Sequence, residues 1–317
     1  MTDMQDDVFK TPVNKIRLFE HGAPGSQNLK LTRKYYTEDM PDGRVKHIVQ
    51  NITDPDIVPY IPDGIGNSTD RQRIPAVLII PGGAFRRLVY NFEGEDVAKW
   101  LNSMGIAAFV LECRLPSDEH DNAEDVPLID AMRAMRVIRG RAQEFGIDEA
   151  KIGVMGFSAG GFMAALLSTA YESDVYADYK YKDEYDKLSA RPDFAVCSYP
   201  VISIDDCIEA GKRYMSEEQV LERISDSKAK ILHKYNPDKL VRPDMPPVFI
   251  CETDDDRTTL SENSVGFYMA ARKAGVSAEL HIFRTGGHGY GCGDDSAQTG
   301  EWKVLFTKWI KSIGIIS

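Results

Sequence analysis

The sequence of 317 residues lacks the marks of several protein classes. It has no run of about eighteen apolar residues, the length expected of a membrane-spanning helix. Its first residues lack the basic and apolar regions of a signal peptide. Positive charge is also scarce, with 38 Lys and Arg against 49 Asp and Glu and a net charge of −11. Nucleic acids are bound by clustered Lys and Arg, so we expect neither a nucleic acid nor a membrane as partner.

One local cluster of basic residues is an exception to this excess of acidic residues. Arg133, Arg136, Arg139 and Arg141 fall on one face of a predicted helix. Such a cluster is typical of a solvated helix face as well as of a basic patch that binds a polyanion. Because the chain as a whole is acidic, we interpret these arginines as a solvated face.

Cysteine is scarce and shows no pairing pattern. The five cysteines are scattered, and no two of them form a CxxC pair: Cys113, Cys197, Cys207, Cys251 and Cys292. Three lie in or beside apolar runs, where cysteine behaves as a small hydrophobic residue. Together with the missing signal peptide, this pattern predicts a reduced, cytoplasmic protein.

Internal repeats and low-complexity linkers are also missing, which favours one domain over residues 1–317. From residue 74 onwards, short apolar runs alternate with amphipathic helical stretches, as in βαβ units around a parallel sheet. The strands we expect are 76–80, 106–111, 151–155, 194–199, 247–251 and 278–283. Residues 1–73 should add short strands and loops, at 15–19 and 47–52 among others. The polar segments 171–190 and 204–245 interrupt the alternation, and we interpret them as cap-like insertions.

A GxSxG motif lies between a predicted strand and a predicted helix. It reads Gly156-Phe157-Ser158-Ala159-Gly160. A nucleophilic serine in this context sits on a sharp strand-to-helix turn, where glycines allow neighbouring backbone to approach. The structural alternative is a serine that only caps the helix. The order of strand, motif and helix favours the nucleophile.

A second glycine pair follows the first core strand, in Pro81-Gly82-Gly83-Ala84-Phe85. Backbone N–H groups at such a turn can stabilise the oxyanion of an acyl-transfer reaction. We assign this role to Gly83 and Ala84, together with the N–H of Ala159 after the serine. A tight turn that merely ends the strand is the alternative.

A serine nucleophile needs a base and an acid that orients it. Of six histidines, only His288 lies in a glycine loop just past a strand, the place where α/β sheets carry their sites. The acidic run Glu252–Asp256 follows the preceding strand. The order serine, acid, histidine is that of α/β-hydrolases. The residues alone leave Asp255 and Asp256 open as the acid.

Metal-binding patterns are weak. The acidic run lacks the glycine and terminal glutamate of a calcium loop. The set His288, Cys292, Asp294 and Asp295 has the spacing of no common metal site. We expect neither a metal nor an organic cofactor. Arg114 is interpreted as a member of a structural ion pair.

Several segments resemble the esterase branch of the α/β-hydrolases, in particular its acetyl xylan esterase-like and carbohydrate-ester hydrolases. The resemblance covers about residues 75–312 and rests on PGGAF, EGEDVAKWLNSMGIAAFVLECRLP, GFSAGGFMAALL, RPDFAVCSYPVIS, ENS and GGHGYG. It implies that the acid precedes Asn263-Ser264 by a fixed stretch, which selects Asp256. It further implies substrate contacts from Phe85 and Phe157. Departures from the pattern occur at Ala84, Phe85, Cys113 and Met163, where the family often has glycine, tyrosine, tyrosine and histidine.

The resemblance predicts a serine carboxylesterase that removes short acyl groups, with acetyl groups on carbohydrates as the expected substrate. The partner would be a small ester, such as an acetylated oligosaccharide. A serine exopeptidase or amidase is the alternative, because GxSxGG also resembles prolyl-oligopeptidase-type enzymes. A non-catalytic binding protein on this fold is a third possibility. We expect 85–90 and the two inserted segments to shape the pocket, and the oligomeric state stays open.

Overall fold

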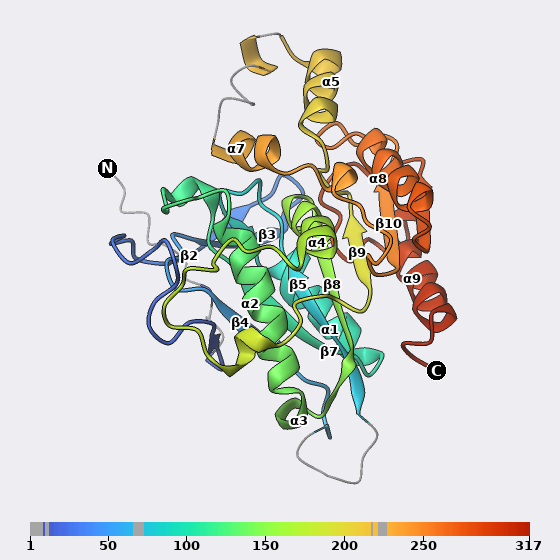
Figure 1. Cartoon of the computed structure of the whole chain (residues 1–317). Helices are drawn as coiled ribbons and strands as arrows, with labels where there is room; N and C mark the ends of the chain where they lie inside the picture. The colour runs from blue at the N-terminus through green and yellow to red at the C-terminus, as the bar shows by residue number, and fades with distance from the viewer. Residues whose placement is uncertain (1–8, 10–12, 66–72, 217, 221–226) are drawn as a thin grey trace.

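The computed structural model describes residues 9, 13–65, 73–216, 218–220 and 227–317, and its centre is an eight-stranded sheet (Figure 1). In spatial order the strands are β1 (Ile16–Arg17), β4 (Asp56–Tyr60), β7 (Ala107–Glu112), β5 (Ile74–Ile80), β8 (Ile147–Phe157), β9 (Ala195–Ser198), β10 (Val248–Thr253) and β11 (Ala278–Phe283). The strands from β7 to β11 are parallel, and β4 and β1 join one edge antiparallel. The predicted α/β fold with a mostly parallel sheet of about eight strands is confirmed.

The six core strands lie within a few residues of their predicted positions. Side chains of β7, β9 and β10 are buried along the whole strand. Continuous burial follows from helices on both faces, and it explains why these strands read as unbroken apolar runs. Cys197 and Cys251 lie in this core as free thiols, which agrees with their interpretation as small hydrophobic residues.

Helices cover both faces of the sheet (Figure 1). On one face, α1 (Asp96–Ser103) and α9 (Glu301–Ser312) meet through the rings of Trp100 and Trp302. The other face carries α2 (Val126–Gly140), the short α3 (Ala142–Phe145), α4 (Ala159–Ala170) and α8 (Ser261–Lys273). Single turns of helix occur at η1 (Asn91–Glu95), η2 (Pro116–Asp118), η3 (Glu184–Lys187), η4 (Pro237–Lys239) and η5 (Gln298–Gly300).

A small antiparallel sheet stands beside the main one. It consists of β2 (Lys34–Asp39), β3 (Val45–Gln50) and β6 (Leu88–Val89). Because β6 follows directly after the Gly82–Phe85 loop, this sheet attaches the N-terminal region to the carboxyl edge of the central sheet. The residues of the β2–β3 turn thereby come close to the loops that follow the core strands.

The arginine face of α2 is not solvated, contrary to the expectation. Residues 171–191 lie along α2 and accept hydrogen bonds from three of these arginines, while Arg141 pairs with Glu144. Arg133 is buried and donates to Asp183 at 2.7 Å. Arg136 donates to the carbonyl of Leu188 at 3.0 Å, and Arg139 to that of Arg191 at 2.9 Å. A guanidinium has five N–H donors, so it can bind the carbonyls of a chain that has few backbone partners of its own.

The second inserted segment lies at the carboxyl edge of the sheet, at the top of Figure 1. It contains α5 (Ile204–Tyr214) and α7 (Ser227–Lys234). Among the helices described, none combines the length and the apolar character needed to cross a lipid bilayer.

The interpretation of Arg114 as an ion-pair residue is confirmed. Its guanidinium lies 2.7 Å from a carboxylate oxygen of Asp130 on α2, and both side chains are fully buried. A further N–H of the guanidinium donates to the hydroxyl of Ser26 at 2.8 Å. This pair fixes the loop after β7 onto α2, close to the carboxyl ends of β5 and β8.

Candidate active site

The turn between β8 and α4 carries Ser158 in a strained conformation, with φ 53° and ψ −119°. A Cβ at Gly156 would lie 1.9 Å from the carbonyl oxygen of Gly160, and a Cβ at Gly160 would lie 1.9 Å from that of Ile80. Only glycine fits at both positions. The GxSxG spacing therefore follows from how closely strand, turn and helix approach one another.

Ser158, His288 and Asp256 come from three separate loops and lie in one line of contacts. The Nε2 atom of His288 is 2.9 Å from Oγ of Ser158. Its Nδ1 atom is 2.6 Å from Oδ2 of Asp256. With the proton on Nδ1, the carboxylate accepts a hydrogen bond from the ring, and Nε2 accepts one from the serine hydroxyl. The structure thus brings together the three residues that the sequence singled out.

Asp255 and Asp256, the two candidates for the acid of the triad, differ sharply in their burial and contacts. Asp256 is 2% exposed, and its Oδ1 accepts the N–H groups of Thr258 at 2.7 Å and Thr259 at 3.0 Å. Burial opposes ionisation of Asp256, but the hydrogen bond from His288 and these two N–H groups outweigh it and hold its pKa below the usual value. An ionised carboxylate is the form that can hold an imidazolium.

Asp255 points elsewhere. Its Oδ1 accepts the N–H groups of Gly286 at 2.9 Å and Gly287 at 2.8 Å. Asp255 therefore fixes the backbone of the loop that carries His288. Within the described part of the chain, it forms no hydrogen bond with the imidazole of His288.

The N–H groups of Gly83, Ala84 and Ala159 donate no hydrogen bond to the described part of the chain. Gly83 and Ala84 line the same pocket as Ser158 and His288. Their φ angles of 137° and 58° turn the chain sharply after Gly82. Ala159 opens α4, where the first N–H groups of a helix have no partner within it. The arrangement is chemically suited to an oxyanion, because free donors lie beside the serine.

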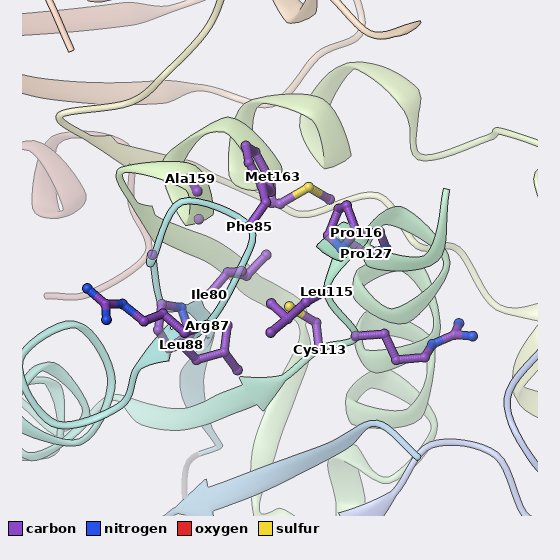
Figure 2. A pocket seen from close by; sticks show the side chains of 14 residues that line it. Ile80, Phe85, Arg87, Leu88, Cys113, Leu115, Pro116, Pro127, Ala159 and Met163 are labelled. Carbon is purple, nitrogen blue, oxygen red and sulfur yellow. The ribbon is translucent and has the colours of Figure 1, made fainter. Parts of the chain in front are cut away.

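Two pockets lie at the serine turn: Ser158 lines one of them, and its neighbour Ala159 lines the other. The larger has a volume of about 650 Å³ and holds Ser158 and His288. The smaller, shown in Figure 2, has a volume of about 10 Å³ and is lined mainly by apolar side chains. Phe85, Met163 and Leu115 are among the lining side chains labelled in Figure 2. Phe85 thus lines a pocket, and its contact with the substrate stays a prediction.

The prediction for Phe157 is wrong. Its side chain is fully buried, and its ring contacts those of Tyr199 and Trp302 in the core. Phe157 is the last residue of β8, where neighbouring side chains point to opposite sides. Although Phe157 is next to Ser158 in the sequence, its side chain therefore does not reach the pocket.

The walls of the larger pocket differ from those expected. Residues 85–90 contribute through Arg87 and Val89, but neither segment 171–190 nor segment 204–245 lines either pocket in the described residues. One wall comes instead from the β2–β3 hairpin, through Met40, Asp42, Arg44 and Lys46. A further part of the lining comes from the loop after His288, including Asp294. Nothing in the sequence indicated that this polar hairpin lines the pocket, because the hairpin lies more than a hundred residues before Ser158 in the chain.

Glu93 is a further pocket residue that the sequence did not single out. It is 4% exposed and accepts the N–H of Gly82 at 2.8 Å. The only sequence signal was its position in the EGEDVAKWLN segment, within the resemblance to esterases.

No cluster of three or more His, Cys, Asp or Glu side chains that could hold a metal ion is present in the described ranges.

The strained serine turn, the parallel sheet and the line from Ser158 to Asp256 together define an α/β-hydrolase. The BD-FAE family model matches residues 65–270, and the chain belongs to this family. An acetylxylan esterase of Xylanibacter ruminicola is 30% identical over 240 residues, which are 75% of this chain and 45% of that protein. The chain thus spans less than half the length of this relative.

Solved structures show the same likeness. An acetyl ester-xyloside bifunctional hydrolase of Caldicellulosiruptor lactoaceticus is 37% identical with a TM-score of 0.66, over 83% of this chain and 90% of that one. An esterase of Thermogutta terrifontis with bound propionate is 23% identical with a TM-score of 0.65, over 93% of this chain and 96% of that one. At the lower identity, the likeness establishes the fold.

Proposed function

We propose that this chain is a serine carboxylesterase, with Ser158 as nucleophile, His288 as general base and acid, and Asp256 as the residue that orients the imidazole. The observation that carries the proposal is the pair of contacts at His288, 2.9 Å to Ser158 and 2.6 Å to Asp256. Membership of the BD-FAE family and likeness to named esterases support it.

The proposed reaction has two steps. Oγ of Ser158 forms a bond to the ester carbonyl carbon while its proton passes to Nε2 of His288. The carbonyl oxygen becomes an oxyanion beside the N–H groups of Gly83, Ala84 and Ala159. The bond to the alcohol oxygen then breaks, and the alcohol leaves with the proton from Nε2. Water hydrolyses the acyl-serine by the same route and regenerates the hydroxyl.

The sizes of the two pockets support small acyl groups on larger, polar alcohols. The apolar hollow between Phe85 and Met163 has room for little more than a methyl group. The larger pocket carries polar and charged side chains from the hairpin and from the loop after His288, which suits a hydroxylated alcohol such as a sugar. The likeness to an acetylxylan esterase agrees with acetylated oligosaccharides as substrates.

Release of acetate from acetylated xylo-oligosaccharides tests the proposal directly. Acetate should accumulate at a rate far above the uncatalysed one, and p-nitrophenyl acetate should also be hydrolysed. Amide bonds of p-nitroanilides should react far more slowly than these esters. Faster cleavage of the amides would instead establish the exopeptidase or amidase alternative.

The cytoplasmic location expected from the N-terminal sequence stays a prediction.

Acyl-chain length should have a large effect on rate. We expect kcat/KM to fall by about tenfold or more from p-nitrophenyl acetate to butyrate, because the two additional methylenes overfill a packed pocket at a cost of roughly 1–3 kcal/mol. Met163→Ala should open the hollow and raise the butyrate-to-acetate ratio. Met135→Ala, the same change at a buried position of α2 outside the hollow, is the control and should leave the ratio unchanged. A preference of the wild type for octanoate would contradict the assignment of the hollow as acyl pocket.

The two neighbouring aspartates should separate clearly in kinetics. Asp256→Asn should lower kcat by about 10³–10⁴-fold, because the amide N–H favours the tautomer with the proton on the wrong nitrogen of His288. Asp255→Asn keeps an oxygen for the N–H groups of Gly286 and Gly287 and should stay within about fivefold of wild type. Steady-state hydrolysis of p-nitrophenyl acetate measures both. The reverse order of effects would make Asp255 the acid.

A further inference from the structure

Glu93 is a buried carboxyl group with no role in the proposed chemistry. It lies in η1, a single π-helical turn before α1, and it lines the larger pocket together with Ser158. It forms no ion pair within the described part of the chain, although positive charge at His288 and Lys46 opposes the effect of burial on its pKa. Burial raises the pKa of Glu93 above its usual value. An acid buried without an ion-pair partner is costly, so an apolar residue here would favour stability.

The two oxygens of Glu93 bind two different parts of the site. Oε2 accepts the N–H of Gly82, at the start of the turn that presents Gly83 and Ala84. The approach is close, since a Cβ on Gly82 would lie 2.8 Å from this oxygen. Oε1 accepts the hydroxyl of Tyr199 at 2.9 Å.

Tyr199 extends this contact to the loop of His288. Its hydroxyl oxygen accepts the N–H of Gly291 at 2.9 Å. Its ring packs edge-on against the imidazole of His288, with centroids 5.1 Å apart. Tyr199 is fully buried and has a positive φ of 36°, an uncommon conformation for a tyrosine. The strain shows that surrounding contacts hold this residue in place.

We propose that Glu93 is a positioning residue that fixes the Gly82–Phe85 turn relative to the loop carrying His288. One carboxyl group holds Gly82 directly and holds Gly291 through Tyr199. It thereby sets the distance between the oxyanion donors and the base, on either side of the reacting carbonyl. The inference rests on the proposed esterase function. Displacement of catalytic groups by about 1 Å can cost about a hundredfold in rate, so the expected effect is large.

The test is the pair Glu93→Gln and Glu95→Gln. Glutamine at 93 can still accept from Gly82, but its amide N–H₂ faces the tyrosine hydroxyl, which then loses its acceptor. We expect kcat for p-nitrophenyl acetate to fall by about 10–100-fold with KM within about threefold. Glu95 lies on the same turn and pairs with Lys99 at 2.8 Å on the surface, so its glutamine variant should match wild type.

Binding of a trifluoromethyl ketone separates positioning from a purely structural role. Such a ketone forms a tetrahedral adduct with an active serine and mimics the oxyanion. Its inhibition constant should rise in Glu93→Gln by the same factor as kcat/KM falls. If the melting temperature shows that this variant does not fold, Tyr199→Phe is used instead. That change keeps the ring and removes only the hydroxyl that joins Glu93 to Gly291.

The double variant Glu93→Gln/Tyr199→Phe gives the final criterion. Because both changes break one chain of hydrogen bonds, the double variant should be little worse than Glu93→Gln alone. Fully additive losses, or a Glu93→Gln enzyme with wild-type kcat, would overturn the inference while leaving the esterase intact. A wild type without activity on any ester would reject the proposed function itself, and the inference with it.

Discussion

Ser158→Ala should lower kcat for p-nitrophenyl acetate by about 10⁴–10⁶-fold while the protein folds normally. The change removes a single oxygen, whose described contact is the one to Nε2 of His288 at 2.9 Å. Without Oγ no acyl-enzyme can form. Any residual hydrolysis would come from the oxyanion donors and from substrate binding. Alanine replaces serine without added volume, so the strained turn at φ 53° should be retained.

Ser168→Ala is the matched control for this experiment. Ser168 is buried on α4, one element further along the chain, and its hydroxyl donates to the carbonyl of Ala164 at 2.7 Å. The same chemical change there should leave kcat near wild type. A fluorophosphonate probe should label the wild type and Ser168→Ala but not Ser158→Ala. Persistent esterase activity in Ser158→Ala would assign the nucleophile to another residue.

Arg114→Met should destabilise the protein by about 3–5 kcal/mol, the largest loss of stability we expect from a single substitution here. Asp130 would remain fully buried without its cation, and the hydroxyl of Ser26 would lose its donor. Urea unfolding should show this as a lower transition midpoint. The double variant Arg114→Met/Asp130→Leu removes both charges, so it should recover a large part of the loss.

Arg141→Met is the control for the buried pair. Arg141 pairs with Glu144 at 2.5 Å, where the two side chains are 26% and 53% exposed. An exposed pair three residues apart contributes less than about 1 kcal/mol, so this change should barely move the midpoint. Equal losses at the two arginines, or no gain from the double variant, would show that desolvation of Asp130 does not govern the effect.

The parts of the fold that the sequence predicted are those set by local patterns. Core strands such as β7 and β10 are buried along their whole length, so their apolar runs mark them directly. Ser158 and His288 were recognisable because glycines surround each of them. At Ser158 they avoid clashes with neighbouring backbone, and beside His288 they adopt positive φ angles of 62° and 78°. Counting from Asn263-Ser264 selected Asp256, and its contact with His288 agrees with that choice.

The parts that were missed depend on contacts between distant segments. The arginines of α2 read as a solvated face because their partners, such as Asp183, lie some fifty residues further along the chain. Phe157 was misplaced because nearness to Ser158 in sequence does not reveal the side of the strand on which a ring lies. Glu93 looked like an ordinary acidic residue before a helix. Only its burial between Gly82 and Tyr199 distinguishes it.

The hairpin wall of the larger pocket gives the molecule a modular character. Met40, Asp42, Arg44 and Lys46 precede residues 65–270, which the family model matches. Ser158 and the Gly82–Phe85 turn lie inside the matched range, and His288 lies after it. Under the proposed function, the hairpin therefore contacts the alcohol part of the ester and takes no part in bond breaking. Under the proposed function, exchanging this hairpin would change which alcohol the pocket accepts, while Ser158, His288 and Asp256 would keep their contacts.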